Sequence, residues 1–225
     1  MSENKFEAVL WDLDGVIADT GIYHFQAWQD VFGKRGATFT EEEFMQHFGR
    51  RHDTIIYDTL GRDISKQEFD AITEEKQANY RRRVADNIRA LPGAVELIQS
   101  LNRHGIKIAI ASSAPPENVD IILRGLGIED CFQAMARGTE VAEGKPSPLV
   151  FLLAAERLGV EPGNCVVIED AISGVAAAKK AGMKCVAVTN SHPETSLKKA
   201  DLIVDTLEGI EIDDLAGLFD TDTKK

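Results

Sequence analysis

The stretch Trp11-Asp12-Leu13-Asp14-Gly15-Val16 follows a short apolar run and decides the fold. An apolar run that ends in Asp-x-Asp-Gly predicts a buried strand over residues 6–11 with two carboxylates at its carboxyl end. In an open parallel sheet, ligands bind at that edge. Two carboxylates this close repel each other, and burial penalises both, so such a pair is typically held by a cation or used for chemistry. The alternative is an Asp-Gly turn in which the carboxylates cap backbone donors.

The composition limits the class of protein. A chain of 225 residues with 44% hydrophobic residues has room for one domain, or for one domain with a smaller insertion, around a sizeable core. The net charge of −12 argues against non-specific binding to nucleic acid or to an anionic membrane. This net charge does not exclude a small anionic ligand that is held by a local cluster of lysines and arginines. We expect a monomer or a weak oligomer.

The cysteines and the N-terminal residues indicate the compartment. Cys131, Cys165 and Cys185 are odd in number and widely spaced, which suggests neither a disulfide framework nor a zinc site. The N-terminus lacks a signal pattern, and no apolar run approaches the ~20 residues that a membrane span needs. We therefore expect a cytoplasmic protein with reduced thiols. We expect the acidic stretch from Glu208 to Asp222 to be a solvated tail.

The second half of the chain alternates between helical and strand patterns. Helices are expected at residues 94–103, 117–125, 147–158 and 172–181, the last of them closed by Gly182. Strands are expected at residues 106–111, 132–136, 165–168, 184–188 and 202–204. This alternation predicts an α/β fold with a Rossmann-like parallel sheet and helices on both faces.

Residues 21–88 differ, because they carry helical patterns and no convincing strand. Apolar residues recur near helical spacing from Tyr23 to Phe32, and Thr40 precedes three glutamates as a helix N-cap. Ser65 and Glu68 stand at capping-box spacing before a long stretch without Gly or Pro. We therefore predict that residues 21–88 form an inserted all-helical cap domain, with residues 1–20 and 89–225 as the catalytic core.

Four polar clusters follow the expected strands: Asp12 with Asp14, Ser112 with Ser113, Lys145, and Glu169 with Asp170. Taken singly, each has a structural explanation, such as a helix cap for Ser112 or a solvated surface charge for Lys145. In a parallel sheet, however, all four clusters meet at one edge. That convergence favours a functional site.

The clustered groups suit phosphoryl transfer with a hard cation. Mg²⁺ prefers a few carboxylates together with water and phosphate oxygens, and our candidate ligands are Asp12, Asp14, Glu169 and Asp170. Phosphoryl transfer also needs a nucleophile, charge neutralisation, and an acid or base for the other oxygen. Asp12 is the candidate nucleophile and Asp14 the candidate proton shuttle. Lys145 and Ser112, or Ser113 in its place, are candidates for holding the phosphoryl oxygens.

These motifs, in this order, resemble the four motifs of the haloacid dehalogenase superfamily of phosphotransferases. The resemblance spans roughly residues 6–204. It implies a Rossmann-like core, a helical cap inserted after the first motif, Mg²⁺, and an aspartyl-phosphate intermediate. The dehalogenases of the superfamily have a different first motif, and Asp14 places this chain with the phosphatases and mutases.

Within the superfamily, residues 19–28 and the cap resemble the β-phosphoglucomutase group of sugar-phosphate mutases and phosphatases. The resemblance implies that Thr20 is a hinge residue, that His24 helps to gate the general acid/base, and that Lys76 contacts substrate. The alternatives are a core or interface histidine for His24 and a solvated helix face for Lys76.

Two departures from that group bear on the reaction. The lysine that follows the second motif in the mutases is missing from residues 112–118 here, and the cap arginine for the distal phosphate falls opposite His52. Arg50 and Arg51 stand beside it as candidate substrate-binding residues. A mutase must hold a bisphosphorylated intermediate by both ends, whereas a phosphatase holds one phosphate.

The sequence therefore predicts a phosphatase of a small phosphorylated metabolite, with a sugar phosphate favoured, and a β-phosphoglucomutase-type isomerase as the alternative. A phospho-switch module similar to a response-regulator receiver domain uses related groups, but such a module needs no cap. A catalytically idle binding protein finds no support, because all four motifs are intact.

Overall fold

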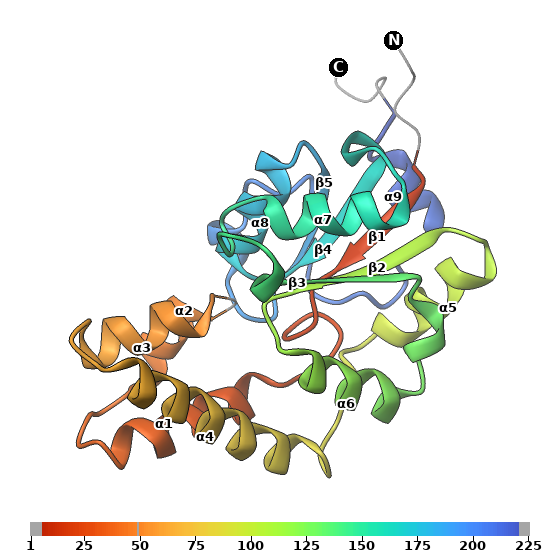
Figure 1. Cartoon of the computed structure of the whole chain (residues 1–225). Coiled ribbons are helices and arrows are strands. Elements are labelled where there is room, and N and C mark those ends of the chain that lie inside the picture. Colours follow the sequence, from red (N-terminus) through yellow and green to blue (C-terminus); the bar gives the residue numbers. More distant parts are fainter. Residues whose placement is uncertain (1–5, 49, 221–225) are drawn as a thin grey trace.

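The computed structural model describes residues 6–48 and 50–220, and its centre is a six-stranded parallel sheet (Figure 1). The strands are β1 (Ala8–Trp11), β2 (Lys107–Ser112), β3 (Ala134–Arg137), β4 (Cys165–Glu169), β5 (Lys184–Val188) and β6 (Leu202–Val204). Their order across the sheet is β3-β2-β1-β4-β5-β6. This is the doubly wound order of Rossmann-like folds, and the chain reverses direction across the sheet between β1 and β4. The predicted fold class is confirmed.

The helices are α1 (Gly21–Gly33), α2 (Glu41–His47), α3 (His52–Leu60), α4 (Lys66–Val84), α5 (Ala94–Arg103), α6 (Pro116–Leu126), α7 (Leu149–Leu158), α8 (Ile172–Lys180) and α9 (Ile212–Gly217). Short 3-10 turns lie at Glu129–Cys131, Gly138–Glu140, Pro162–Asn164 and Glu194–Ser196. The expected strands, and the expected helices from residue 94 onward, agree with these bounds within two residues.

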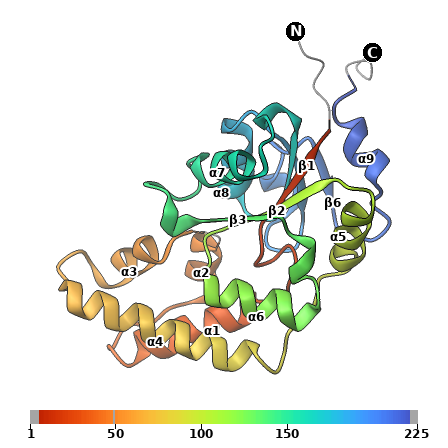
Figure 2. The same ribbon diagram turned by 45° about the vertical axis from the view of Figure 1, so that its right-hand side comes forward.

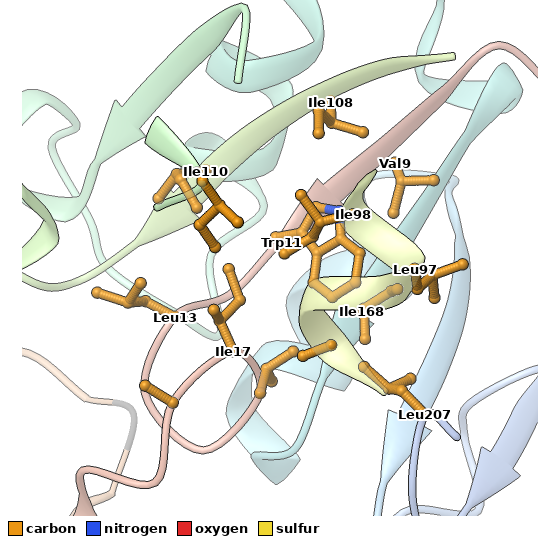
Figure 3. Packing of buried hydrophobic residues seen from close by; sticks show 14 of the residues in the cluster. Val9, Trp11, Leu13, Ile17, Leu97, Ile98, Ile108, Ile110, Ile168 and Leu207 are labelled. Atoms are coloured by element: carbon orange, nitrogen blue, oxygen red, sulfur yellow. The ribbon is translucent and has the colours of Figure 1, made fainter. Parts of the chain in front are cut away.

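Strand residues alternate between two buried layers, one on each face of the sheet. Val9 and Trp11 of β1 pack with α5, α6 and α9, as the close view in Figure 3 shows for α5. Ala8 and Leu10 point to the opposite face and pack with α7 and α8. The two-residue period of a strand sends alternate side chains to opposite faces, so both faces need helical cover. Cys165 and Cys185 are buried free thiols in this second layer.

Helices α1 to α4 lie together beyond the end of the sheet, where α4 lies beside α6 (Figures 1 and 2). They enclose an aromatic core of their own around Trp28 and Phe32 of α1. Thr40 accepts a hydrogen bond from the Glu43 amide, and the Glu43 carboxylate accepts one in return from the Thr40 amide, which makes a full capping box at α2. Ser65 caps α4 by accepting from the Glu68 amide.

The chain leaves and re-enters the sheet region through two adjacent segments. The Asp19 amide donates to the Arg89 carbonyl at 3.1 Å, and the Leu91 amide donates to the Ile17 carbonyl at 2.9 Å. These two bonds hold the connections of the helical segment side by side. We retain the division at residues 20 and 89 as a proposal.

The acidic C-terminal stretch differs from the expected solvated tail. Helix α9 places Leu215 in the core with no exposed surface, and Leu218 and Phe219 pack against the same layer. The Phe219 ring stacks on Phe6 with centroids 6.0 Å apart. The expectation was wrong because three apolar residues at helical spacing outweigh the surrounding acidic ones; residues 221 and 222 lie outside the described part. No helix within residues 6–48 and 50–220 is long and apolar enough to cross a membrane.

Candidate active site

The loops after β1 and β4 meet at the point where the sheet reverses direction. The Asp12 amide donates to the Ile168 carbonyl at 3.1 Å, which holds the end of β1 against β4. Glu169 is the last residue of β4, and Asp170 follows it. Topology alone therefore brings Asp12, Glu169 and Asp170 into one buried group, with exposures of 6%, 1% and 1%.

Lys145 connects the first and last of the predicted motifs. Its Nζ donates to Asp12 Oδ1 at 2.5 Å and to Glu169 Oε1 at 2.7 Å. Glu169 Oε2 accepts from the backbone amides of Asp170 and Ala171, each at 2.8 Å. Both Glu169 oxygens are thus engaged by the protein. Burial lowers the pKa of Lys145, but the two carboxylates outweigh that effect and raise it above its usual value, so Lys145 is an ammonium.

Asp12, Glu169 and Asp170 together carry more negative charge than Lys145 balances. Burial raises the pKa of Asp12 to about 7, against the opposing effect of Lys145, and burial with Glu169 and Asp12 raises that of Asp170 well above its usual value. Asp170 is held by the Ser191 hydroxyl, which donates to its Oδ2. Three carboxylates against one ammonium leave two negative charges, the charge that a divalent cation neutralises.

The donor set fits Mg²⁺ with ligands from outside the protein. In the described part of the chain, no group of three or more His, Cys, Asp or Glu residues forms a metal cage. Mg²⁺ does not need one, because it binds through one or two carboxylates and keeps water or substrate phosphate oxygens. Asp12 and Asp170 are the carboxylates best suited, since both Glu169 oxygens have protein donors.

Asp14 has a different environment from Asp12, although the two lie in one loop. Its Oδ1 accepts from the Thr20 hydroxyl at 2.5 Å, lies 3.1 Å from His24 Nε2 and 3.4 Å from the Tyr80 hydroxyl. Burial raises the pKa of Asp14, but His24 and Thr20 outweigh burial and lower it to about 2. The pKa of Asp12 is therefore raised and that of Asp14 is lowered, which is typical of an acid/base pair with separate roles.

Lys76 is buried behind His24 and does not lie on a solvated helix face. Its Nζ lies 2.7 Å from His24 Nδ1 and 5.2 Å from the ring centres of Trp28 and Tyr80. Burial lowers the pKa of Lys76 to about 7, and burial with Lys76 lowers that of His24. Because Lys76 donates to Nδ1, neutral His24 carries its proton on Nε2 and donates it to Asp14.

A cavity separates the core from the helical segment. It is lined by Asp12, Asp14, His24, Trp28, Phe44, His47, Phe48, Arg50, His52, Ile55, Ser112, Ser113 and Ala114. Its floor is the carboxyl end of the sheet, and its roof is formed by α1, α2 and α3. The open volume of about 50 Å³ is far below that of a pocket for a small-molecule ligand. A phosphorylated sugar therefore requires the roof to move away from the floor.

The predicted site residues fall into three groups around this cavity. Asp12, Asp14, His24, Arg50, Ser112 and Ser113 line it. The buried residues that are not part of its lining are Thr20, Lys76, Lys145, Glu169 and Asp170. Arg51 does not line it; its guanidinium lies 3.4 Å from Asp53 and reaches the Val141 and Ala142 carbonyls.

The structure adds residues that sequence reasoning did not assign to the site. His47, which received no role from the sequence, lines the cavity with Trp28 and Phe48. His52 was noted only as a departure from a resemblance, and it lies in the cavity wall as well. No spacing signal marks these residues, because their proximity to Asp12 comes from the packing of the helical segment on the core.

The fold and the site define a Rossmann-like phosphotransferase with an aspartate-rich centre. The sequence pattern of the haloacid dehalogenase-like hydrolases matches residues 6–182, and the chain belongs to this family of enzymes.

Its relatives include phosphatases and mutases. Beta-phosphoglucomutase of Bacillus subtilis is 36% identical over 205 residues, covering 88% of each chain. The phosphorylated carbohydrates phosphatase of Thermotoga maritima is 36% identical over 182 residues, covering 79% of this chain and 82% of the relative. The crystal structure of beta-phosphoglucomutase from Clostridium difficile superimposes with a TM-score of 0.86 at 31% identity, covering 95% of this chain and 97% of that one. One relative from Arabidopsis thaliana is much longer, and the chain spans 21% of its length.

Proposed function

We propose that the protein is a Mg²⁺-dependent phosphomonoester hydrolase that acts on a small phosphorylated metabolite, with a sugar phosphate favoured, through an aspartyl phosphate on Asp12. The position of Asp12 supports this proposal most directly. Asp12 lines the cavity together with Ser112 and Ser113, and Lys145 Nζ donates to its Oδ1. A carboxylate nucleophile beside phosphate-binding hydroxyls and an ammonium is the set that phosphoryl transfer through an enzyme ester requires.

The first half-reaction follows from these groups. A carboxylate oxygen of Asp12 forms a bond to phosphorus, and the bond from phosphorus to the substrate oxygen breaks. The leaving oxygen takes a proton from the carboxylic acid form of Asp14. When bound by Asp12 and Asp170, Mg²⁺ supplies neutralisation of the phosphoryl charge.

The second half-reaction returns the enzyme to its starting state. Water attacks phosphorus, Asp14 accepts its proton, and the bond from Asp12 to phosphorus breaks. In this structure Asp14 is an anion held by Thr20, His24 and Tyr80. Asp14 must leave these partners to reach the leaving oxygen, so proton transfer and movement of the helical segment are coupled.

The test of this mechanism is Asp12→Asn. Asparagine keeps the shape and an oxygen for Lys145 but is no nucleophile, so turnover of phosphomonoesters should fall by roughly 10⁴-fold or more. Acid-quench trapping of ³²P from a labelled substrate should label the native chain and not the variant. Retained phosphatase activity in Asp12→Asn would contradict the mechanism.

The second candidate is a β-phosphoglucomutase-type reaction, and relatives of that name support it. The chain would be incubated with Mg²⁺ and β-glucose 1-phosphate, primed with a trace of the 1,6-bisphosphate. Glucose 6-phosphate and free phosphate are then followed together. Free phosphate alone supports the hydrolase, whereas glucose 6-phosphate outpacing phosphate supports the mutase. The absence of both would make glucose phosphates the wrong substrates.

A further inference from the structure

The loop after β5 borders the carboxylates of the candidate active site. β5 pairs with β4 in parallel, so its carboxyl end opens on the same edge of the sheet. The Ser191 hydroxyl of this loop donates to Asp170 Oδ2. The Asn190 amide nitrogen donates to the Gly15 carbonyl at 3.3 Å. The loop thus contacts both segments that carry the proposed metal ligands, the one that begins with Asp12 and the one that contains Asp170.

The carboxylate of Asp170 is enclosed on the side of its Oδ2. Asp170 is 1% exposed, and among the described residues Ser191 is its side-chain hydrogen-bond donor. Gly15 fills the space beside this contact: a Cβ added there would overlap Asp170 Oδ2 and would lie 3.0 Å from Ser191 Oγ. With a φ of +83°, Gly15 also has a backbone conformation that favours glycine. The hydroxyl and the glycine together determine which oxygen faces the protein, and Oδ1 is the one left for a cation.

The other two carboxylates of the group are engaged in a related way. Lys145 Nζ donates to Oδ1 of Asp12 and to Oε1 of Glu169. Two backbone amides donate to the remaining oxygen of Glu169. Asp12 and Asp170 therefore offer one oxygen each, Oδ2 and Oδ1. Among these three carboxylates of the described chain, none is open to a cation on both of its oxygens.

Single carboxylate oxygens suit Mg²⁺ better than Ca²⁺. Mg²⁺ requires near-octahedral geometry and binds through one or two carboxylates with water or phosphate oxygens. Ca²⁺ takes about six to eight oxygen ligands and accepts both oxygens of one carboxylate. Without the Ser191 hydroxyl, the Asp170 carboxylate would be free to turn and present both oxygens. Hydrogen bonds of this kind orient metal ligands, and their loss typically costs about 10–100-fold in metal affinity.

Resting on the Mg²⁺-dependent hydrolase function proposed above, we infer that Ser191 is a positioning residue for the cation. Its hydroxyl holds Asp170 Oδ2 so that this carboxylate binds a metal ion through Oδ1 alone, and this contact makes the site select Mg²⁺ over Ca²⁺. Ser191 acts through Asp170 and takes no part in phosphoryl or proton transfer. The alternative is a serine that only anchors its loop, and the loss of such a serine would weaken both cations alike.

The test measures cation binding without substrate, so that it does not depend on turnover. The melting temperature of the full chain is titrated with MgCl₂ or CaCl₂ at constant ionic strength, and its rise gives a dissociation constant for each cation. We expect the native chain to bind Mg²⁺ more tightly. Ser191→Ala should weaken Mg²⁺ binding about 10–100-fold. The constant for Ca²⁺ should change much less, so that the preference for Mg²⁺ falls at least tenfold.

Further variants separate the hydroxyl from the position. Ser191→Thr keeps a hydroxyl and should keep the preference for Mg²⁺. Ser196→Ala removes an exposed hydroxyl from the 3-10 turn at Glu194–Ser196 and should leave both constants unchanged. If Ser191→Ala does not fold, Ser191→Cys, whose thiol is only a weak donor, must lower the preference instead.

Each outcome decides the inference. A native chain that binds Ca²⁺ as tightly as Mg²⁺ overturns it. So does a Ser191→Ala variant with native circular dichroism whose two constants change by the same factor or not at all. A preference that falls in Ser191→Ala and is kept in Ser191→Thr supports it. Failure of the hydrolase proposal would show separately, as an absence of phosphate release by the native chain with Mg²⁺, whatever the two affinities are.

Discussion

Removal of the Lys145 ammonium should destabilise the fold far more than removal of a surface lysine. Lys145→Met keeps the length of the side chain and deletes the charge that holds Asp12 and Glu169. The side chains concerned have exposures of 1%, 8% and 1%, so water cannot replace the ammonium. Deleting one partner of a buried ion pair costs about 3–5 kcal/mol. For a chain of this length that corresponds to a melting temperature lower by roughly 6–20 °C.

The assay is urea unfolding in EDTA at pH 8, where no cation substitutes for the lost charge. At pH 5 the loss should be smaller, because Asp12, whose pKa is raised to about 7, is then protonated in the folded state. Lys66→Met is the matched control: Lys66 pairs with Asp70 at 2.6 Å, but the two side chains are 88% and 58% exposed. A pair this exposed contributes little to stability, because water solvates both charges. A loss below about 1 kcal/mol for Lys145→Met, or equal losses in both variants, would refute the reasoning.

Three further predictions concern the same region. Mg²⁺ should raise the melting temperature more at pH 7.5 than at pH 5. The pKa of Asp12 is raised in the folded state, so its ionisation lowers the stability of that state as pH rises from about 4 to 7. At pH 7.5 and about 100 times its Kd, Mg²⁺ should raise the melting temperature by ~5–10 °C, and equal shifts at the two pH values would contradict this prediction. Lys76→Met should raise the free energy of unfolding by ~1–4 kcal/mol at pH 6, because the pKa of Lys76 is lowered to about 7 in the folded state. Urea titrations should show this gain shrinking between pH 7 and 10.5. A gain that does not change with pH would assign the effect to packing. Gly174→Ala should cost ~1–3 kcal/mol in thermal unfolding, because the new Cβ would lie 1.6 Å from Glu169 Oε1, whereas Gly33→Ala, with open space around it, should cost nothing.

The core of the fold could be predicted because its signals are local. Apolar runs of strand length alternate with helical patterns from Ala94 onward, and the carboxyl ends of parallel strands necessarily share one edge. The proximity of Asp12, Lys145 and Glu169 follows from that topology, although Lys145 lies 133 residues after Asp12 along the chain. The order of motifs was therefore enough to predict which polar clusters meet.

The roof of the cavity could not be predicted in the same way. Helices α1 to α4 have no sheet to fix their order, and their positions come from the packing of Trp28, Phe32 and their neighbours. Lys76 illustrates the difference. On the sequence it is one cation in a strongly polar helix, and only the folded arrangement shows that its side chain has no exposed surface. The tail was misjudged for the opposite reason, since its charge concealed a short apolar stripe around Leu215.

The contrast between the two sides of the cavity extends to Asp12 and Asp14, the proposed nucleophile and the proposed acid/base. Asp12 is fixed by the core: its amide bonds to β4 and its carboxylate to Lys145. Asp14 is held from the side of the helical segment, since the side-chain donors that reach its Oδ1 within the described residues are Thr20 at the start of α1, His24 of α1 and Tyr80 of α4. Any movement of α1 and α4 would therefore change the partners of Asp14 and leave Asp12 in place. The proposed nucleophile is thus set by the sheet, whereas the proposed acid/base depends on the position of the helices that would have to move to admit the substrate.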